Sequence, residues 1–454
     1  MSLLDQVFGS QPVLEIFSDK ARVQCMLDFE AALATAEARQ GVIPASAGPV
    51  IAAYCKADLI NFAELSRAAA DAGNLAIPLI QQLTAVVGGQ SSEAAQYVHW
   101  GATSQDVIDT ALTLQMRDAL AAMSSELNRL CGLLADLANR YRSTPMVART
   151  WMQHAIPTTF GFKVAGWLDG MLRHRVRLVS WRDQATLQFG GAAGTLAALG
   201  STGLVIAAEV ASELKLELPD IPWHTQRDRI AEGATGLAML TGSLGKMARD
   251  IALQSQTEVA ELSEPAKVGR GGSSSMPHKR NPVNTAVILA AAEQTPFLAG
   301  TILAAMPQEH ERGLGNWLAE WDTVPQLFRL CSGALFRMLV VIDGLVVYPD
   351  RMLKNLELTR GLIFAEAASM ALARQLGRKE AHHLMELLSG KAITEQKHLE
   401  QVMREEPRVT DVLDRAALDR IFEPKAYLGE ASRFIDRVLS KHNTIVQAPA
   451  TGNP

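Results

Sequence analysis

The chain has 454 residues, of which 48% are hydrophobic and 20% are charged, and its formal net charge is −5. This length exceeds what one ordinary hydrophobic core supports, so we expect two or three domains. The small negative charge, without a dominant basic face, argues against a nucleic-acid-binding protein. The four cysteines are scattered and form no CxxC or His-rich pattern, so neither a disulfide framework nor a zinc site is indicated.

The sequence contains no recognisable targeting signal. Its N-terminus, MSLLDQVFGSQP, carries an acid and lacks the basic, apolar and small-residue succession of a secretory signal. The apolar stretch near residues 285–306 contains Glu293 and Pro296, so the sequence predicts no membrane span. With cysteines that suit a reducing compartment, these features predict a cytoplasmic protein without a membrane partner.

Helical periodicity is the strongest secondary-structure signal. Between residues 112 and 137, leucine and methionine recur every three or four residues and would form one apolar stripe. The same spacing runs from Leu237 to Ile251, and residues 284–305 are apolar on most faces, as at the centre of a bundle. Helices of roughly thirty residues reach about 45 Å, which is more than a compact monomer usually spans. We therefore expect an oligomer whose interface completes the core.

Two glycine-containing segments interrupt the helical pattern. FGGAAGT at 189–195 lacks the lysine and hydroxyl residue of a phosphate-binding loop, so we expect a turn or close backbone packing there. Residues 268–284, VGRGGSSSMPHKRNPVN, place glycines and serines before Lys279, Arg280 and Asn281 and a helix-like run. Hydroxyls on a mobile loop beside a lysine and a helix N-terminus suit proton transfer next to a carboxylate. A solvated linker that ends in a basic helix cap would have the same composition.

The stretch GSSSMPHKRNP resembles the GSSxMPxKxNP motif of the fumarase/aspartase superfamily. Two further blocks, VHWGATSQDVIDTA at 98–111 and ARTWMQHAIPTTFG at 148–161, agree with it and are most similar to the adenylosuccinate lyase branch. The resemblance continues to EHER at 309–312 and so covers nearly the whole chain in order.

The resemblance implies an all-α fold of three helical domains around a central bundle of long helices, assembled as a homotetramer with shared active sites. The N-terminal helical domain would cover residues 1–110. The central domain, residues 111–347, would mediate oligomerisation and carry the mobile loop 268–282. The C-terminal helical domain would cover residues 348–454.

The motifs also imply a chemistry. Members of this superfamily make or break a bond at the carbon β to a carboxylate, through an aci-carboxylate intermediate. Ser273 matches the serine that exchanges the α-proton, and Ser274 stays open as a neighbouring alternative. Lys279 and Asn281 match the residues that bind the carboxylate on which charge develops, together with N–H groups at the helix start. As an alternative, Lys279 and Asn281 only cap that helix.

The remaining implied substrate-binding residues all lie in the quoted motifs: His99, Thr103, Ser104, Thr150, Trp151, Gln153, His154, His278 and Arg312. His99 would donate to a substrate carboxylate, or be a core histidine whose ring nitrogens are satisfied. Thr103 and Ser104 would donate to carboxylate oxygens or cap the helix that follows. No metal or organic cofactor is expected, because the motifs contain no ligand cluster.

One departure from the lyase pattern decides the expected substrate. Adenylosuccinate and argininosuccinate lyases read RTHxQ in the block at 148–161, with the histidine as general acid, whereas this chain has Trp151. An indole N–H cannot shuttle a proton near neutral pH. A carboxylate nucleophile, with a reference pKa of about 4, is already ionised and needs no such partner. Its attack on a conjugated double bond gives a lactone, which is the reaction of the cycloisomerase branch.

Substitutions at three phosphate-binding positions agree with that reading. Trp317 and Trp321 stand where adenylosuccinate lyase typically has a serine and an arginine for the nucleotide phosphate, and Val287 replaces another arginine. A phosphate would lack charged partners there, unless Trp317 and Trp321, like Trp151, are ordinary core or interface aromatics.

The sequence therefore predicts lactonisation of 3-carboxy-cis,cis-muconate, a small tricarboxylate of aromatic catabolism. The alternative is a lyase that releases fumarate from adenylosuccinate or a related amino-dicarboxylate, with His154 or His278 as the acid. A catalytically inactive structural relative is the third possibility, since a fold does not guarantee an activity.

Overall fold

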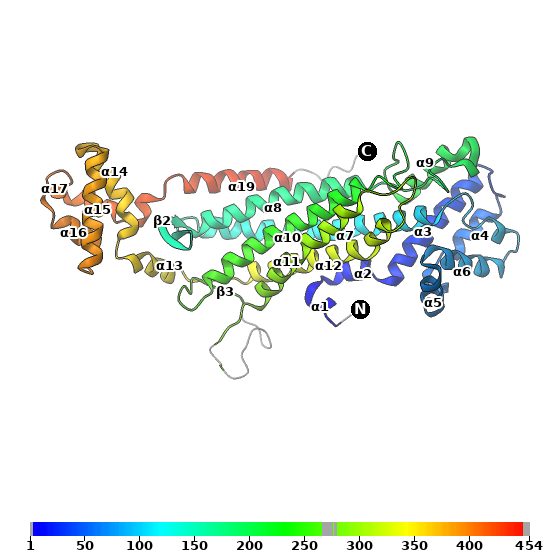
Figure 1. The fold of residues 1–454 in the computed structure, drawn as a ribbon, viewed down its shortest axis with the longest axis horizontal. Helices are drawn as coiled ribbons and strands as arrows, with labels where there is room; N and C mark the ends of the chain where they lie inside the picture. The colour runs from blue at the N-terminus through cyan, green and yellow to red at the C-terminus, as the bar shows by residue number, and fades with distance from the viewer. Residues whose placement is uncertain (1–2, 266–275, 277–278, 448–454) are drawn as a thin grey trace. The chain divides into compact units, whose positions relative to one another are not determined.

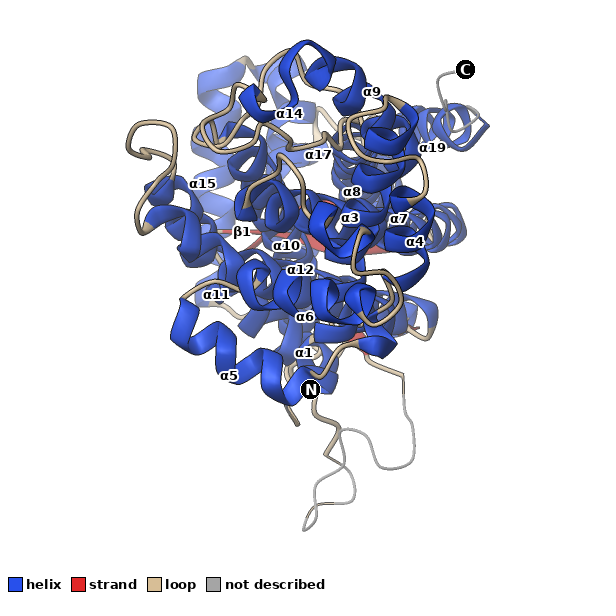
Figure 2. Ribbon diagram, turned by 90° about the vertical axis from the view of Figure 1, so that its right-hand side faces the viewer, coloured by secondary structure: helices blue, strands red, loops and turns tan. Residues whose placement is uncertain are grey.

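The computed structural model describes residues 3–265, 276 and 279–447 of the chain. In these residues almost all regular structure is helical, as Figure 2 shows. The strands among them form two short antiparallel pairs. The described fold confirms the predicted all-α class. Ser273, Ser274 and His278 lie outside the described residues.

The chain divides into two compact units, each assembled from three stretches. Unit 1 comprises Met1–Leu127, His174–Gly245 and Val287–Arg337. Unit 2 comprises Asn128–Arg173, Lys246–Ala286 and Met338–Pro454. This division does not test the three predicted domains, whose boundaries near residues 110 and 347 stay predictions.

Five long helices carry the periodic apolar patterns. They are α7 (Ser104–Arg140), α8 (Phe160–Asp183), α10 (Asp228–Gln254), α11 (Val283–Ala305) and α12 (Asn316–Asp343) (Figure 1). All members of the predicted stripe in α7 are buried: Leu112, Met116, Leu120, Met123, Leu127, Leu130, Leu134 and Leu137. The same holds in α10 for Leu237, Leu240, Leu244, Met247 and Ile251. The helical period thus predicted both these helices and the faces that they bury.

The rest of unit 1 is built from shorter helices: α1 (Asp5–Phe8), α2 (Gln11–Ile16), α3 (Asp19–Arg39), α4 (Ala47–Tyr54), α5 (Phe62–Ala72), α6 (Ala76–Gly88) and α9 (Gly203–Leu214). Helix α3 begins after Ser18, whose hydroxyl accepts a hydrogen bond from the backbone N–H of Ala21 and caps the first turn. Apolar side chains of α3, α4, α6 and α9 share one buried core. That core fixes α3, which supplies a charged residue to the site.

Unit 2 contains a hairpin of β1 (Pro145–Thr150) and β2 (Gln153–Thr159). A second pair joins β3 (Leu262–Ser263) to β4 (Val346–Val347), and α13 (Pro349–Leu356) follows β4. The guanidinium of Arg149 on β1 donates two hydrogen bonds to the buried carboxylate of Glu261, at 2.7 and 2.9 Å. The side-chain amide of Asn355 on α13 donates to the same carboxylate at 2.8 Å. One buried charge thus ties the hairpin, the start of β3 and α13 together.

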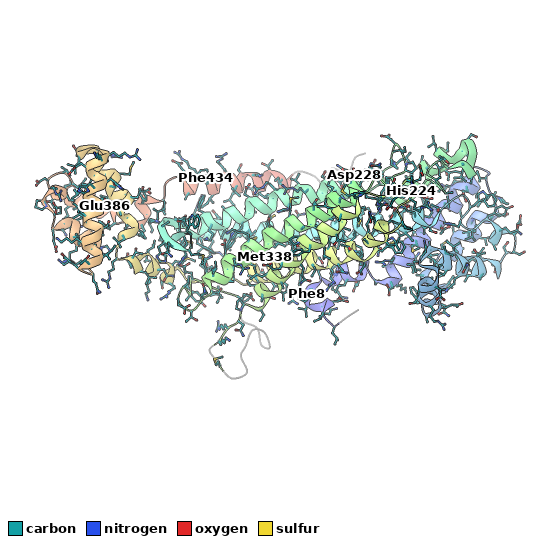
Figure 3. All side chains as sticks on the ribbon, viewed as in Figure 1. Phe8, His224, Asp228, Met338, Glu386 and Phe434 are labelled. Carbon is teal, nitrogen blue, oxygen red and sulfur yellow. The ribbon has the colours of Figure 1, made fainter. Side chains whose placement is uncertain are left out.

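The C-terminal part of unit 2 is again helical: α14 (Ala365–Leu376), α15 (Arg378–Thr394), α16 (Leu399–Arg404), α17 (Pro407–Thr410), α18 (Arg415–Ile421) and α19 (Ala431–Gln447). Leucine, valine, alanine and methionine side chains of α14 to α18 form a separate core. Phe434 of α19, labelled in Figure 3, packs its ring 5.9 Å from that of Phe162 on α8. Lys441 of α19 pairs with Asp169 of α8 at 3.0 Å, so α19 is held along that helix.

Three helical segments are long and apolar enough to cross a membrane by length and composition: Ala197–Leu214, Val283–Ala305 and Asn316–Asp343. The sequence predicted no segment of this kind near α11 because of Glu293 and Pro296. That expectation is corrected, because one charge and one proline leave the hydropathy of α11 high. In α12, 67% of the apolar window is buried inside the protein, whereas in α11 only 28% is. Helix α11 therefore presents apolar surface that the described chain does not cover.

Candidate functional site

The block at residues 98–111 leads into α7, and Asp106 organises its backbone. The Asp106 carboxylate accepts the backbone N–H of Thr103 at 3.1 Å, while the Asp106 N–H donates to the Thr103 carbonyl at 3.0 Å. This reciprocal pair caps the helix. Asp106 thus does the capping, and in the described part of the chain no hydrogen bond engages the hydroxyls of Thr103 and Ser104.

Asp106 also holds the glycine-rich segment at 189–195. Its carboxylate accepts the N–H groups of Gly190 and Gly191 at 3.0 and 2.9 Å, and Nε2 of the buried His224 lies 2.8 Å away. A Cβ added at Gly190 would lie 2.8 Å from Pro222 and 2.9 Å from His224. The segment packs closely by its backbone, as its sequence predicted.

His99 is a half-buried residue with a strong carboxylate partner. It adopts a left-handed backbone (φ 61°), and its Nδ1 lies 2.7 Å from Oε1 of Glu30 on α3, whose side chain is only 1% exposed. Burial lowers the pKa of His99, but attraction to Glu30 and Asp106 outweighs it, so the net pKa is raised. The imidazole is therefore favoured as a cation, with one ring nitrogen committed to Glu30.

Arg312 joins the same neighbourhood. Its Nε donates to Oε1 of Gln105 at 3.2 Å, and one terminal nitrogen donates to the carbonyl of Ala192 at 3.2 Å. Gln105 follows Ser104 directly and also donates to the carbonyl of His224 at 2.8 Å. Within unit 1 the structure thus links Arg312 to the start of α7 and to the glycine-rich segment.

A buried ion cluster next to this region corrects one step of the sequence argument. Arg227 donates to both Asp109 and Glu320, and the indole N–H of Trp317 donates to Asp109 at 2.9 Å. Trp317 is 4% exposed and packs edge-on against Trp321, with ring centroids 4.8 Å apart. Trp317 is therefore a core aromatic, as the alternative held, and its position carries no argument about a phosphate.

The block at residues 148–161 forms the β1–β2 hairpin in unit 2. Thr150 pairs with Gln153, so Trp151 and Met152 form a two-residue turn, with φ of 51° and 66°. Such turns favour glycine or asparagine, and each non-glycine residue there costs on the order of 1 kcal/mol. Trp151 is 98% exposed in this chain, so it is not a core aromatic within it. The hairpin presents the indole where lyases keep a histidine.

His154 is a half-buried residue of the hairpin that lies beside an arginine. It lies opposite Arg149 in the hairpin, and its buried Nδ1 has no partner among the described residues. Burial and the neighbouring Arg149 lower the pKa of His154. The neutral imidazole is therefore favoured near neutral pH, which weakens the candidacy of His154 as the general acid of the alternative lyase.

Lys279 and Asn281 immediately precede α11. Lys279 is exposed and Asn281 is half-buried. The first N–H groups of the helix, on Asn284 and Thr285, donate to the carboxylate of Glu264 at 3.2 and 2.7 Å. The expectation that these N–H groups bind the substrate carboxylate is wrong for this structure, because Glu264 already occupies them. The cap alternative for Lys279 and Asn281 loses its basis for the same reason.

The structure places the predicted site residues in two groups. His99, Thr103, Ser104 and Arg312 belong to unit 1. Thr150, Trp151, Gln153, His154, Lys279 and Asn281 belong to unit 2. The sequence reasoning missed Glu30, Asp106, Glu261 and Glu264, the carboxylates that hold these residues. Of these, Asp106 had a local signal, its position three residues after Thr103 in a capping pattern.

Comparison with known proteins identifies the family. Residues 9–296 match the family model described as "Lyase", and residues 361–438 match "Adenylosuccinate lyase C-terminus". The chain belongs to this lyase family. A 3-carboxy-cis,cis-muconate cycloisomerase of Pseudomonas aeruginosa is 52% identical over 98% of this lyase chain and 97% of its own length. A protein of the same name from Bradyrhizobium diazoefficiens is 52% identical over 96% and 97%.

A solved structure agrees with these relatives. The 3-carboxy-cis,cis-muconate lactonizing enzyme of Pseudomonas putida superposes with a TM-score of 0.93 at 49% identity, covering 98% of this lyase chain and 99% of that one. The likeness therefore extends over nearly the whole of both chains. The roles of individual residues are not tested by this likeness and stay predictions.

Proposed function

We propose that this protein is an intramolecular lyase that converts 3-carboxy-cis,cis-muconate to a carboxymuconolactone. The observation that carries the proposal is its 52% identity, along nearly the whole of both chains, to relatives named for this reaction. Trp151 supports it, because an indole at the hairpin turn suits a nucleophile that needs no acid or base partner.

In the proposed reaction, one substrate carboxylate oxygen forms a bond to the conjugated carbon. The displaced π electrons move onto the α-carbon and its carboxylate, which becomes the aci-carboxylate. Lys279 and the amide of Asn281 stabilise this charge as it develops. Ser273 delivers a proton to the α-carbon, which completes the lactone and returns the carboxylate, and the serine then recovers its proton from solvent. Ser274 stays the alternative donor.

The substrate carries three carboxylates, so binding requires cations. His99 supplies one, because Glu30 and Asp106 raise the pKa of its imidazole and so favour the cation, and Arg312 supplies another. Thr103, Ser104, Thr150 and Gln153 would donate hydrogen bonds to the remaining oxygens. His154 is assigned to hydrogen bonding as a neutral imidazole.

The assembly and setting belong to the same proposal. We infer a cytoplasmic homotetramer with shared active sites that acts in the protocatechuate branch of aromatic catabolism, the β-ketoadipate pathway. The uncovered apolar surface of α11 supports an oligomer, since packing against other copies would bury it. On this view its hydropathy reflects a protein interface and not a membrane.

A direct assay tests the proposal. Purified protein is mixed with 3-carboxy-cis,cis-muconate, and the loss of conjugated-diene absorbance is followed while NMR identifies the product. Lactone formation is the expected result. Release of fumarate from adenylosuccinate, with no change in the muconate, would instead establish the alternative lyase. No turnover of either substrate would favour an inactive structural relative.

A further inference from the structure

The start of α11 is held by a carboxylate from a distant part of the chain. Oε2 of Glu264 accepts the backbone N–H and the side-chain amide of Asn284, at 3.2 and 2.8 Å. Oε1 accepts the backbone N–H of Thr285 at 2.7 Å and also its hydroxyl. Both acceptor oxygens are thus used twice, by donors about twenty residues further along the chain.

This arrangement replaces a local cap. The first N–H groups of an α-helix lack partners in the helix and attract anions, and a residue just before the helix usually satisfies them. Here Asn284 and Thr285 are each 1% exposed, so water cannot serve them well. Glu264 supplies both the hydrogen bonds and the negative charge that this position favours.

The backbone next to Glu264 is held by a strand pair and by contacts of its neighbours. Glu264 follows β3, which pairs with β4, and the hydroxyl of Ser263 lies 3.1 Å from that of Tyr348. Pro265 restricts the backbone of Glu264 to extended conformations. The Pro265 ring packs closely against Gly344, because a Cβ added at Gly344 would lie only 2.6 Å from Cβ of Pro265. The position of Glu264 is therefore set by β3 and its neighbours, and Glu264 in turn sets the start of α11.

Two proposed catalytic residues depend on that start. Lys279 and Asn281 lie four and two residues before Val283, the first residue of α11, and the N–H of Val283 donates to the Asn281 carbonyl at 2.9 Å. Because Glu264 fills the helix N-terminus, the charge that develops on the substrate carboxylate must be stabilised by these side chains instead. A shift of α11 would move Asn281 with it.

We propose that Glu264 is a positioning residue for the reaction, which fixes Lys279 and Asn281 by bracing the first turn of α11 against β3. This inference rests on the proposed function. Glu264 acts through the helix and does not touch the substrate. It belongs with Glu261, three residues earlier, whose carboxylate braces the hairpin that carries Trp151.

The test compares Glu264→Gln with wild-type enzyme in steady-state assays. The glutamine amide keeps the shape of the side chain, but it loses the negative charge and one of the two oxygens that each accept two hydrogen bonds. Lys279 and Asn281 should then be misplaced, and kcat should fall by about tenfold to a hundredfold. KM should change by less than about threefold, because charge-stabilising contacts in the transition state are lost while ground-state binding remains. Unchanged kcat, with or without a lower melting temperature, would show a purely structural role and overturn the inference.

A second pair of variants tests the contact between Glu264 and Thr285 by changing Thr285. Thr285→Val removes the hydroxyl that Glu264 accepts, whereas Thr285→Ser keeps it. Valine should lower kcat in the same sense, and serine should retain the wild-type value. The effects of Thr285→Val and Glu264→Gln should be non-additive, since the two residues share one interaction. Fully additive losses would contradict the proposed bracing.

Glu366→Gln is the matched control, because its carboxylate accepts from the Tyr427 hydroxyl at 2.7 Å elsewhere in unit 2. This control should keep the wild-type kcat. The substrate that the wild-type enzyme turns over tests the proposed function separately. If it turns over only adenylosuccinate, the proposed lactonisation is rejected. The ratio of variant to wild-type kcat on adenylosuccinate then still tests the role of Glu264.

Discussion

The charge on His99 depends chiefly on the buried carboxylate of Glu30, and Glu30→Gln tests this dependence. Glu30 is 1% exposed and lies 2.7 Å from His99, close enough for a charge-assisted hydrogen bond. The substitution keeps the shape of the side chain and removes its negative charge. The pKa of His99, now raised, should fall towards its ordinary value of about 6.5, because burial is then opposed only by the weaker attraction of Asp106.

The expected consequence is a loss of substrate affinity in a defined pH window. A hydrogen bond between charged groups contributes about 1.5 to 3 kcal/mol, so losing the His99 cation should raise KM by about tenfold or more. The difference should be largest between the variant's lowered pKa and the raised wild-type pKa. Below that window both imidazoles are protonated and KM should converge; above it both are neutral and KM should converge again.

The raised pKa of His99 also predicts how the free energy of unfolding changes with pH. A histidine whose pKa is raised by folding contributes stability that is fully present below its unfolded pKa and is lost as pH rises through the folded pKa. Wild-type protein should therefore lose this part of its free energy of unfolding as pH rises from the unfolded pKa through the raised folded pKa of His99, and Glu30→Gln should not. Urea unfolding at several pH values measures it.

Helix α3 offers a matched control for this prediction. Burial, with the nearby charge of Glu30, raises the pKa of Glu37 to about 9, so Glu37 is already neutral at pH 7. Glu37→Gln should therefore leave KM and its pH dependence unchanged. The reasoning is refuted if Glu30→Gln raises KM by the same factor at every pH, or if both variants behave alike.

Three further predictions concern other parts of the protein. Ser273→Ala should lower kcat by at least about a hundredfold on 3-carboxy-cis,cis-muconate while Ser274→Ala spares it; the reverse pattern would move the proton donor by one residue. Trp317→Phe should lower the free energy of unfolding in urea by about 2 kcal/mol through the lost bond to Asp109, without changing KM. Met152→Gly should raise the free energy of unfolding by about 1 kcal/mol, because glycine tolerates φ of 66°; a loss of stability would show that the methionine side chain makes a compensating contact.

Local patterns in the sequence predicted much of the fold. The apolar stripe of α7 and that of α10 repeat every three or four residues, and a helix of that period must bury one face. The motif blocks predicted the family, because they keep residue types in a fixed order over most of the chain. They also named the site residues, whose roles await the assays described above.

The partners of those residues were beyond prediction from sequence. Glu30 and His99 are 69 residues apart, and His224 and Asp106 are 118 apart. Trp317 looked like a ligand-site substitution until its indole was found bonded to Asp109 in a buried ion cluster. No pattern of local spacing encodes which charges meet across such distances.

The amino-acid sequence by itself determined the helical class, the faces that the long helices bury and the superfamily, since each depends on residue type at short, regular spacing. Only the tertiary structure decided the opposite shifts in the pKa of His99 and His154, the burial of Trp317 and the filling of the α11 N-terminus by Glu264. Protonation and helix capping depend on the solvent exposure and neighbouring charge of each group, which arise when distant segments pack together.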